Sequence, residues 1–369
     1  MNKCNERELF VFAGQSNMMW AATLPPKLKL NICNSFEYKY KKRRAGNKHG
    51  EFVPVSYSVG EFAYCDMKKA YPTNNFNSLS ELSNYTDNTY FVPALCNLDN
   101  FNERSVIGFS EFSEKTAVNG PSLPPYFVNE WEQIGRRCAI AHMAKGSTTI
   151  LHYFDEEMVE SYNKKIVQHN DSYKTNYPLI CKENMNFRAL TYFSHEVEAF
   201  FDDATLMFAE DIIKTKAFVW LQGESDAELS EIEYRLRLEI LWDRLRFLGF
   251  THFFCIRVGL WGDELNITEI MKAQERFCLE NKSCYMLTRS CSFMTFPENY
   301  KNLSYIKTPD EKYFECRDSF FGFPNNHINE KWHTIIAKQA VANVKRILID
   351  NDEAILEEEL VVDLITNNW

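Results

Sequence analysis

The sequence contains no long apolar run and no surplus of basic charge. Nowhere among its 369 residues do about 18 apolar residues follow one another, so no segment has the character of a membrane-spanning helix. The formal net charge is -10, which argues against a general nucleic-acid binder because such a protein needs a basic face. One basic run, KYKKRRAGNK at 39–48, departs from this trend, and we interpret it as a solvated loop.

Metal-binding and disulfide patterns are also missing. The 11 cysteines lie between Cys4 and Cys316 without a CxxC pair or a Cys/His ligand spacing. This distribution favours free, mostly buried thiols in a reduced compartment over a zinc site or a disulfide framework. The N-terminal segment MNKCNERELF lacks the apolar core of a secretory signal. We therefore expect a soluble, cytoplasmic protein without a metal site.

Apolar residues are abundant and occur in short runs. Hydrophobic residues make up 45% of the chain and aromatic residues 15%, which is enough for a sizeable core. Short continuous apolar runs predict buried parallel strands, because strands covered on both faces are hydrophobic throughout rather than alternating. The runs are 9–13, 138–143, 217–221, 253–258 and 285–287.

Segments with helical periodicity lie between these runs. Residues 225–248 begin with SDAE, a capping box of Ser225 and Glu228, and continue with apolar residues at helical spacing. A second amphipathic helix is predicted from Asn329 onward. Its apolar stripe consists of Trp332, Ile336, Ala340, Val344 and Ile347. Strands alternating with helices predict an α/β fold with a doubly wound parallel sheet.

We interpret residues 1–369 as a single domain of this kind. Residues 21–115 break the alternation and are rich in Asn, Ser, Tyr and Phe, which predicts a long, irregular, loop-rich insertion. Such a loop in a compact enzyme is typical of a substrate wall or lid, and the alternative is a disordered segment. Residues 350–369, DNDEAILEEELVVDLITNNW, form an acidic C-terminal tail.

Polar clusters follow three of the predicted strands. GQSN at 14–17 follows the first, KGST at 145–148 the second and QGESD at 222–226 the third. Because the carboxyl ends of parallel strands meet at one edge of a sheet, we expect the three clusters to converge where ligands bind. We interpret Gly14 and Gly223 as residues that allow tight turns and close approach of the backbone.

A hydrolytic serine in such a place needs a base, a group that orients the base, and donors for the oxyanion. Among the eight histidines, His142 and His152 flank the segment AKGSTTI, and His142 lies inside a predicted buried strand, which is typical of a core histidine. His169 and His195 have no chemical context. His327 stands in a loop two residues before the predicted N-cap Asn329, where a side chain can reach a strand end. We therefore favour His327 as the base over His333, which lies inside the predicted helix.

The blocks AGQSNM, GPSL, AKGST, WLQGESD and HIN before a terminal helix occur in this order. Together they resemble the SGNH hydrolase superfamily, in its sialate O-acetylesterase-like branch, which includes the acetylxylan esterases of carbohydrate esterase family six. The resemblance runs from residue 9 to about residue 345, interrupted by the insertion. It implies a flavodoxin-like, three-layer α/β/α hydrolase that removes acetyl groups from sugar hydroxyls without a metal or another cofactor.

The resemblance also implies roles for single residues. Ser16 resembles the nucleophile and His327 the general base. Gly120, which opens GPSL, resembles a backbone donor to the oxyanion, and Gln222 stands where the third block supplies a side-chain donor. Further positions in these blocks that we expect to bind the oxyanion or the substrate are Gln15, Asn17 and Gly146.

One position departs from the family pattern. The family usually has Asp three residues before the histidine, and this chain has Pro324 there. Either the site is a Ser–His dyad, or another carboxylate orients the imidazole of His327. Glu224 is our candidate, ahead of Asp226 and Asp318, and the alternative for Glu224 is a purely structural carboxylate.

The sequence therefore predicts a serine esterase that removes O-acetyl groups from a carbohydrate through an acyl-enzyme intermediate. One alternative is an O-acetyltransferase with the same Ser/His site, which exclusion of water would favour. The other is a degenerate, non-catalytic glycan-binding protein, a reading that Pro324 favours. The expected partner is an O-acetylated sugar or glycan rather than nucleic acid or a membrane. Neither the particular sugar nor the oligomeric state follows from the sequence.

Overall fold

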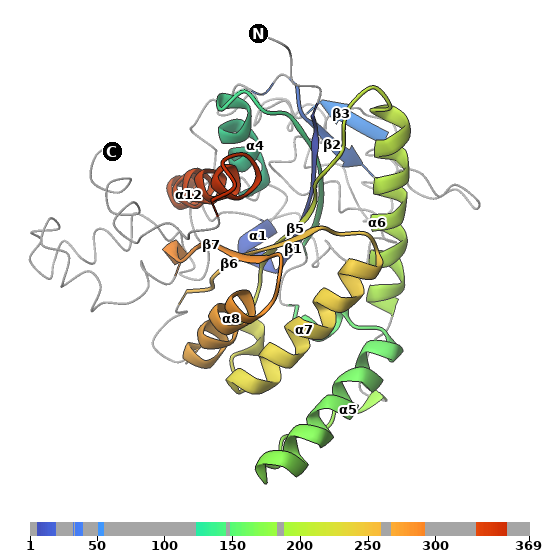
Figure 1. The fold of residues 1–369 in the computed structure, drawn as a ribbon, viewed down its shortest axis with the longest axis vertical. Helices are drawn as coiled ribbons and strands as arrows, with labels where there is room; N and C mark the ends of the chain where they lie inside the picture. Colours follow the sequence, from blue (N-terminus) through green and yellow to red (C-terminus); the bar gives the residue numbers. More distant parts are fainter. Residues whose placement is uncertain are drawn as a thin grey trace, which may run out of the picture.

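The computed structural model of the protein describes most of the predicted core and leaves out several connecting segments. The described residues are 6–19, 32, 34–39, 51–54, 123–144, 148–182, 188–259, 267–291 and 330–352. They form a central sheet with helices packed on both of its faces, which is a three-layer α/β/α arrangement (Figure 1). The fold class predicted from the sequence is thus confirmed.

Seven strands make up the sheet, in the order β3-β2-β4-β1-β5-β6-β7. The strands are β1 (Glu8–Gly14), β2 (Phe36–Lys39), β3 (Glu51–Pro54), β4 (Cys138–Ala144), β5 (Lys216–Leu221), β6 (His252–Ile256) and β7 (Cys284–Thr288). All neighbouring pairs are parallel except β2 with β3, which is antiparallel at the edge of the sheet. In chain order, β1, β4, β5, β6 and β7 follow the flavodoxin-like order 2-1-3-4-5.

Four of the apolar runs that predict a strand lie within one, and the fifth, 253–258, extends two residues beyond the end of β6. β1 and β4 are buried along their whole length, as the absence of alternation in their sequences predicts. Their side chains meet those of the covering helices. Phe10 of β1, for example, makes edge-to-face contacts with Phe127 and Trp131, at ring-centroid distances of 5.1 and 5.7 Å. The central strands therefore form the core of the molecule.

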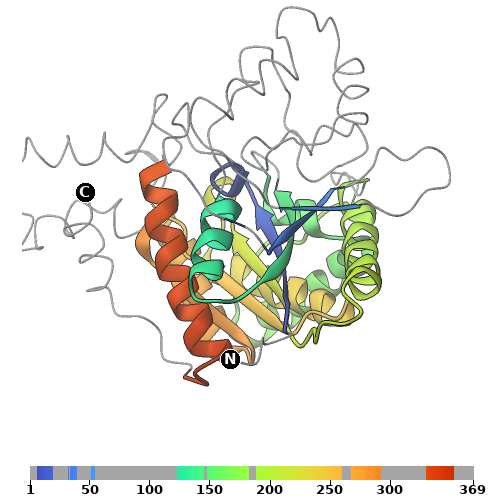
Figure 2. The ribbon, with the colours of Figure 1, turned by 90° about the horizontal axis from the view of Figure 1, so that it is seen from above.

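Two layers of helices cover the sheet. The helices are α1 (Ser16–Met19), α4 (Leu123–Gln133), α5 (Glu156–Tyr173), α6 (Arg188–Met207), α7 (Glu231–Phe247), α8 (Thr268–Glu280) and α12 (Glu330–Leu348), with the short 3-10 helices η3 (Ile150–Tyr153) and η5 (Glu224–Asp226). α4 and α12 pack side by side on one face (Figures 1 and 2). α6, α7 and α8 lie on the other face, and α5 extends away from the body beyond α7.

The structure corrects two expectations from the sequence. Residues 21–115 are not irregular throughout, since β2 and β3 lie within them and extend the sheet beyond β4. The helix predicted from Ser225 begins later, at Glu231, and its capping box is formed by Ser230 and Glu233. The cause is tertiary, because the turn that holds Ser225 belongs to η5 and is bonded to other loops. The terminal helix α12 is present as predicted.

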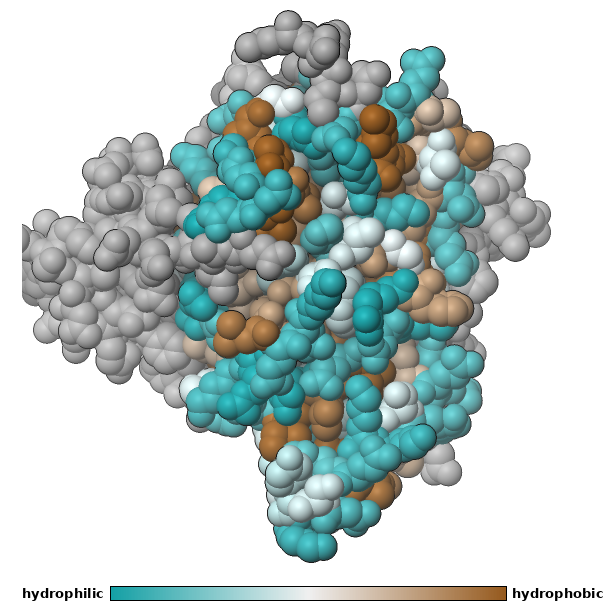
Figure 3. Space-filling model, in the orientation of Figure 1, coloured by the Kyte–Doolittle hydropathy of each residue, from teal (hydrophilic) through white to brown (hydrophobic). Residues whose placement is uncertain are grey.

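Among the helices that the structure describes, none is long and apolar enough to cross a bilayer. On the face shown in Figure 3, hydrophobic residues form separate patches between hydrophilic ones. Apolar side chains scattered in this way are usual for a protein surface.

Candidate active site

The order of the strands locates a binding site before any side chain is considered. In an open α/β sheet, ligands bind outside the carboxyl ends of the strands, where the strand order reverses. Here the reversal lies between β1 and β5, which pair in parallel from Leu9 and Lys216 to Gly14 and Leu221. The loops that leave these two strands carry GQSN and QGESD. The two clusters therefore converge as the sequence predicts.

The loop after β1 turns sharply to reach α1. Gly14 has a φ of +144°, and a Cβ at this residue would lie 2.0 Å from the carbonyl oxygen of Leu221. Only glycine fits such a close approach of two strands. The Gln15 N–H then donates to the same carbonyl at 3.1 Å, and Ser16 follows as the first residue of α1. The strand-to-helix turn thus holds the backbone of Ser16 at the end of β1.

Two side-chain contacts tie this loop to the loop after β5. The Asn17 amide donates to Glu224 Oε1 at 2.8 Å. The backbone N–H of Ser225 donates to Gln15 Oε1 at 3.2 Å. The side chains of Gln15, Asn17 and Glu224 are all buried. The structure therefore brings these three predicted site residues together around Ser16.

Gln222 lies between the two loops with its amide facing the protein. Its Nε2 donates to the Thr148 carbonyl at 2.9 Å and to Asp226 Oδ2 at 2.6 Å, and it lies 3.4 Å from Gln15 Oε1. The side chain is fully buried. In this structure the amide hydrogens predicted to bind an oxyanion are thus directed at protein acceptors.

Asp226 is a second buried carboxylate of this region. It accepts hydrogen bonds from the Ile150 N–H at 2.7 Å and from Gln222, both at Oδ2. Burial raises the pKa of this carboxyl from 3.8 to about 6, against the opposing effects of the two hydrogen bonds and of Arg237, whose guanidinium is 3.8 Å away. Its contacts hold protein segments in place, so Asp226 is a structural member of the site.

The start of α4 lies at the edge of the sheet where the carboxyl ends of the parallel strands meet. The Trp131 indole near the end of α4 donates to Glu8 at the start of β1, at 3.0 Å. The helix therefore runs antiparallel to β1, and its first residue, Leu123, is near the carboxyl ends of the strands. α1 packs against α4, which places the beginnings of both helices close to each other.

Like α4, α12 runs antiparallel to the strands of the sheet. Its Asn343 amide donates to the Leu287 carbonyl at 2.5 Å, and its Gln339 accepts a hydrogen bond from Thr288 at the end of β7. β7 and α12 therefore run in opposite directions, and the first residue of α12, Glu330, lies toward the carboxyl end of β7. The first residue of α12 is consequently on the side of the candidate site.

Four of the described histidines have surroundings that do not favour a role as the base. His333 is fully buried in α12, with its ring centroid 6.5 Å from that of Tyr126 in α4. His142 is buried in β4. His152 Nδ1 accepts from the Thr149 N–H at 3.1 Å, within the capping box of η3. His169 lies in α5, with its ring centroid 4.6 Å from that of Tyr173.

Several predicted site residues fall outside the described part of the chain. These are Gly120, Gly146, His327, Pro324 and Asp318, together with the side chains of Ser16 and His195. Their roles stay predictions. Among the described residues, no group of three or more His, Cys, Asp or Glu side chains could hold a metal ion.

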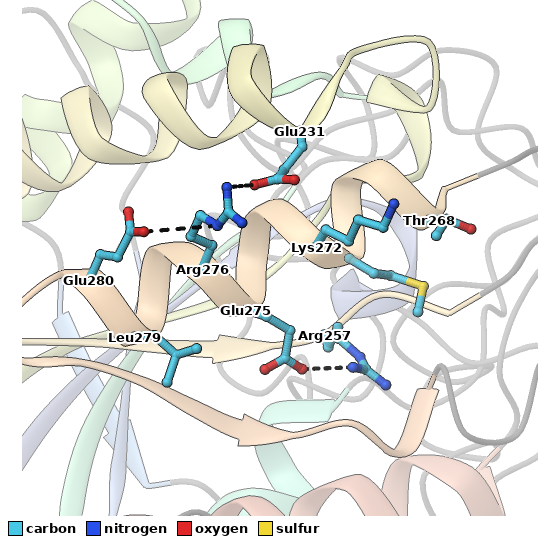
Figure 4. A pocket seen from close by; sticks show the side chains of 9 residues that line it. Glu231, Arg257, Thr268, Lys272, Glu275, Arg276, Leu279 and Glu280 are labelled. Carbon is cyan, nitrogen blue, oxygen red and sulfur yellow. Dashed lines mark hydrogen bonds and ion pairs between the residues drawn. The ribbon is translucent and has the colours of Figure 1, made fainter.

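A cavity of about 400 Å³ lies apart from the site, along the outer side of α8 (Figure 4). Its cations are paired with carboxylates, as in Arg257–Glu275 and Arg276–Glu231, both at 2.7 Å. This groove carries no net charge, and we do not consider it the candidate site for acyl chemistry, which we place at the strand ends.

Comparisons with known proteins give only distant similarities. No protein-family model and no curated protein matches the chain. Among solved structures, the crystal structure of NanS is similar with a TM-score of 0.46 and 10% identity, covering 95% of this chain and 100% of that one. A carbohydrate acetylesterase from Xanthomonas citri is similar with a TM-score of 0.36 and 12% identity, covering 75% and 49%. A protein from Arabidopsis thaliana is similar with a TM-score of 0.40 and 13% identity, covering 91% and 97%.

Proposed function

We propose that this protein is a serine esterase that removes O-acetyl groups from a carbohydrate, with Ser16 as its nucleophile. The observation that carries the proposal is the contact between the loops after β1 and β5, the two strands between which the strand order reverses. There the Asn17–Glu224 hydrogen bond, 2.8 Å long, joins the residue after Ser16 to the QGESD loop. A serine on a tight turn between a strand and a helix is well placed to present its hydroxyl to a substrate.

In the proposed reaction, Ser16 Oγ attacks the ester carbonyl carbon while His327 takes its proton. The tetrahedral oxyanion collapses, the bond to the sugar oxygen breaks, and His327 returns the proton to that oxygen. Water then attacks the acetyl-Ser16 ester with His327 again as the base, and acetate leaves. Backbone N–H groups of Ser16 and Gly120 are the proposed donors to the oxyanion.

The connections of the chain support these roles. In the sequence, Gly120 comes three residues before α4 and His327 three residues before α12. Both helices begin toward the edge of the sheet at which β1 and β5 end. The described starts of α1, α4 and α12 thus lie toward one edge, which supports the proposed roles of Ser16, Gly120 and His327 as nucleophile, oxyanion donor and base.

Glu224 is the proposed orienting acid, in place of the Asp that Pro324 replaces. Its buried carboxylate is held by Asn17, which fixes the side chain next to the nucleophile loop. A carboxylate that orients an imidazole must itself be fixed, because the tautomer and the direction of the ring depend on it. We expect Glu224→Gln to lower kcat by about 10- to 100-fold while the protein remains folded.

The test is hydrolysis of p-nitrophenyl acetate by the wild type and by single alanine variants at Ser16, His327 and His333. The proposal predicts that Ser16→Ala and His327→Ala each lose at least about 100-fold in kcat/KM. His333→Ala is the matched control, since it removes a second histidine near the start of α12, one that is fully buried and packs beside Tyr126. Wild-type activity in Ser16→Ala, or an inert wild type, would contradict the proposal.

A further inference from the structure

Residues 148–153, which we call the brace, connect the loop after β5 to the end of β1. At one end, the Gln222 amide donates to the Thr148 carbonyl at 2.9 Å. Beside this contact, the Ile150 N–H donates to Asp226 Oδ2 at 2.7 Å. The brace is thus fixed to the QGESD loop by two hydrogen bonds, both made by side chains of that loop.

The other end of the brace holds Gly14, two residues before Ser16. The Tyr153 hydroxyl donates to the Gly14 carbonyl at 2.8 Å and accepts from the Gly14 N–H at 3.0 Å. The Thr148 hydroxyl donates to the same carbonyl at 3.3 Å. Tyr153 is fully buried, so its hydroxyl serves the protein interior rather than a ligand. Tyr153 thus contacts both polar backbone groups of Gly14, and Thr148 adds a second donor to the carbonyl.

The direction of the Gln222 amide is fixed by its neighbours. Its Oε1 lies 2.7 Å from the Tyr234 hydroxyl, which acts as the donor, and its Nε2 faces the acceptors Thr148 and Asp226. The Gln274 amide donates to the main-chain carbonyl of Gln222 at 2.8 Å. A reversed amide would set Gln222 Oε1 against two acceptors, the Thr148 carbonyl and Asp226 Oδ2. Gln222 is therefore held in the orientation that supports the brace.

We propose that Gln222 and Tyr153 are positioning residues for the nucleophile, which act through the brace to hold Gly14 and hence the backbone of Ser16. The inference rests on the proposed esterase function and assigns Gln222 a role other than direct donation to the oxyanion. Neither residue touches the substrate in this account. Their effect is on the geometry of the attacking serine, where a displacement of about 1 Å can cost about 100-fold in rate.

The first test is Tyr153→Phe, which removes the hydroxyl and keeps the ring that packs on Trp220 at 4.9 Å and on Phe193 at 5.6 Å. We expect kcat for p-nitrophenyl acetate to fall by about 10- to 100-fold and KM to change by less than about 3-fold. Tyr162→Phe is the matched control, because it removes another buried tyrosine hydroxyl, from α5, that does not reach Gly14. We expect its kcat to stay within about 3-fold of the wild type.

The second test separates positioning from oxyanion binding by a double-mutant cycle. If Gln222 and Tyr153 act through one brace, the variant with both Gln222→Ala and Tyr153→Phe loses little more activity than the more damaging single change. If Gln222 donates to the oxyanion independently, the two losses multiply. Thermal midpoints are recorded for every variant, and rates are measured well below the lowest of them.

Each result decides between the claims. A wild-type kcat in Tyr153→Phe, or losses that multiply in the double-mutant cycle, would contradict the proposed role of the brace. The esterase proposal would still stand as long as hydrolysis depends on Ser16. If Tyr153→Phe does not fold, Thr148→Val removes the hydroxyl that donates to Gly14 at 3.3 Å and is also hydrogen-bonded to Tyr153, and we expect a kcat loss of about 3- to 10-fold. Wild-type kcat in that variant overturns the brace as well. Hydrolysis that does not depend on Ser16 overturns the esterase proposal and this inference together.

Discussion

Replacement of Gly14 by alanine tests how closely β1 and β5 approach each other at the candidate site. The added methyl group would lie 2.0 Å from the Leu221 carbonyl oxygen and 2.7 Å from its carbon. Both are backbone atoms of a paired, buried strand, so they cannot move aside as the end of a flexible side chain does. The residue would also keep a φ of +144°, which L-residues rarely adopt.

The expected loss of stability in Gly14→Ala has two parts. A positive φ at a non-glycine residue costs about 1–2 kcal/mol. Forcing extra volume into a packed interior costs about 1–3 kcal/mol more. Gly14→Ala should therefore lower the free energy of unfolding by about 2–5 kcal/mol, which is a large part of the stability of an ordinary domain.

Gly249 supplies the matched control for this prediction. It follows α7 with a φ of +93°, and a Cβ there would meet nothing within 4 Å. Gly249→Ala should therefore show only the backbone cost of about 1–2 kcal/mol. Urea unfolding followed by tryptophan fluorescence measures both variants. Equal losses in the two would refute the close approach of Gly14 to β5, and with it the sharp turn that leads to Ser16.

Three further predictions concern other parts of the structure. Burial raises the folded pKa of Asp226 to about 6, above the ordinary 3.8, so its protonation favours the folded state. Wild-type stability relative to Asp226→Asn, measured by urea titration at each pH, should therefore rise by about 2 kcal/mol as the pH falls from 7 to 4. Ser230→Ala should cost about 1 kcal/mol by loss of the α7 cap, whereas Ser225→Ala should cost less than about 0.5 kcal/mol, and equal losses would contradict the observed start of α7. His333→Ala should lower the thermal midpoint yet keep kcat within about 10-fold, and a loss as large as that of His327→Ala would make His333 the base.

The strands were predictable because each of them carries its own signal. A continuous apolar run such as 217–221 can be stable only where both faces are covered, so its place in the sheet follows from its composition. β2 and β3 give no such signal. Each has only four residues, including charged ones, within a segment of mixed polar and aromatic composition. Their pairing depends on an edge of the sheet that β4 provides.

The start of α7 shows why a local motif can mislead. The pattern Ser-x-x-Glu occurs twice within nine residues, at Ser225 and at Ser230, and both copies satisfy the sequence rule for a capping box. The first copy is excluded by tertiary contacts. The Ser225 N–H bonds to Gln15, and the Asp226 carboxylate is occupied by Ile150 and Gln222. Only the second copy is free to begin a helix.

The candidate site was predictable to the extent that topology determines it. Strand ends bring Gln15, Asn17 and Glu224 together, and the sequence places these residues at strand ends. The roles of Tyr153 and Asp226 were not predictable in this way. No local pattern marks Tyr153, and its bond to Gly14 exists only because η3 folds back across the end of β1.

The most direct test of the central claim is to locate the covalent adduct that a fluorophosphonate forms with the wild-type protein. Intact-mass measurement counts the adducts, and peptide mapping assigns the modified residue. The account predicts one adduct per chain, on Ser16, and none in Ser16→Ala. An unlabelled wild type, or an adduct on another residue that persists in Ser16→Ala, would contradict the claim that Ser16 is the nucleophile.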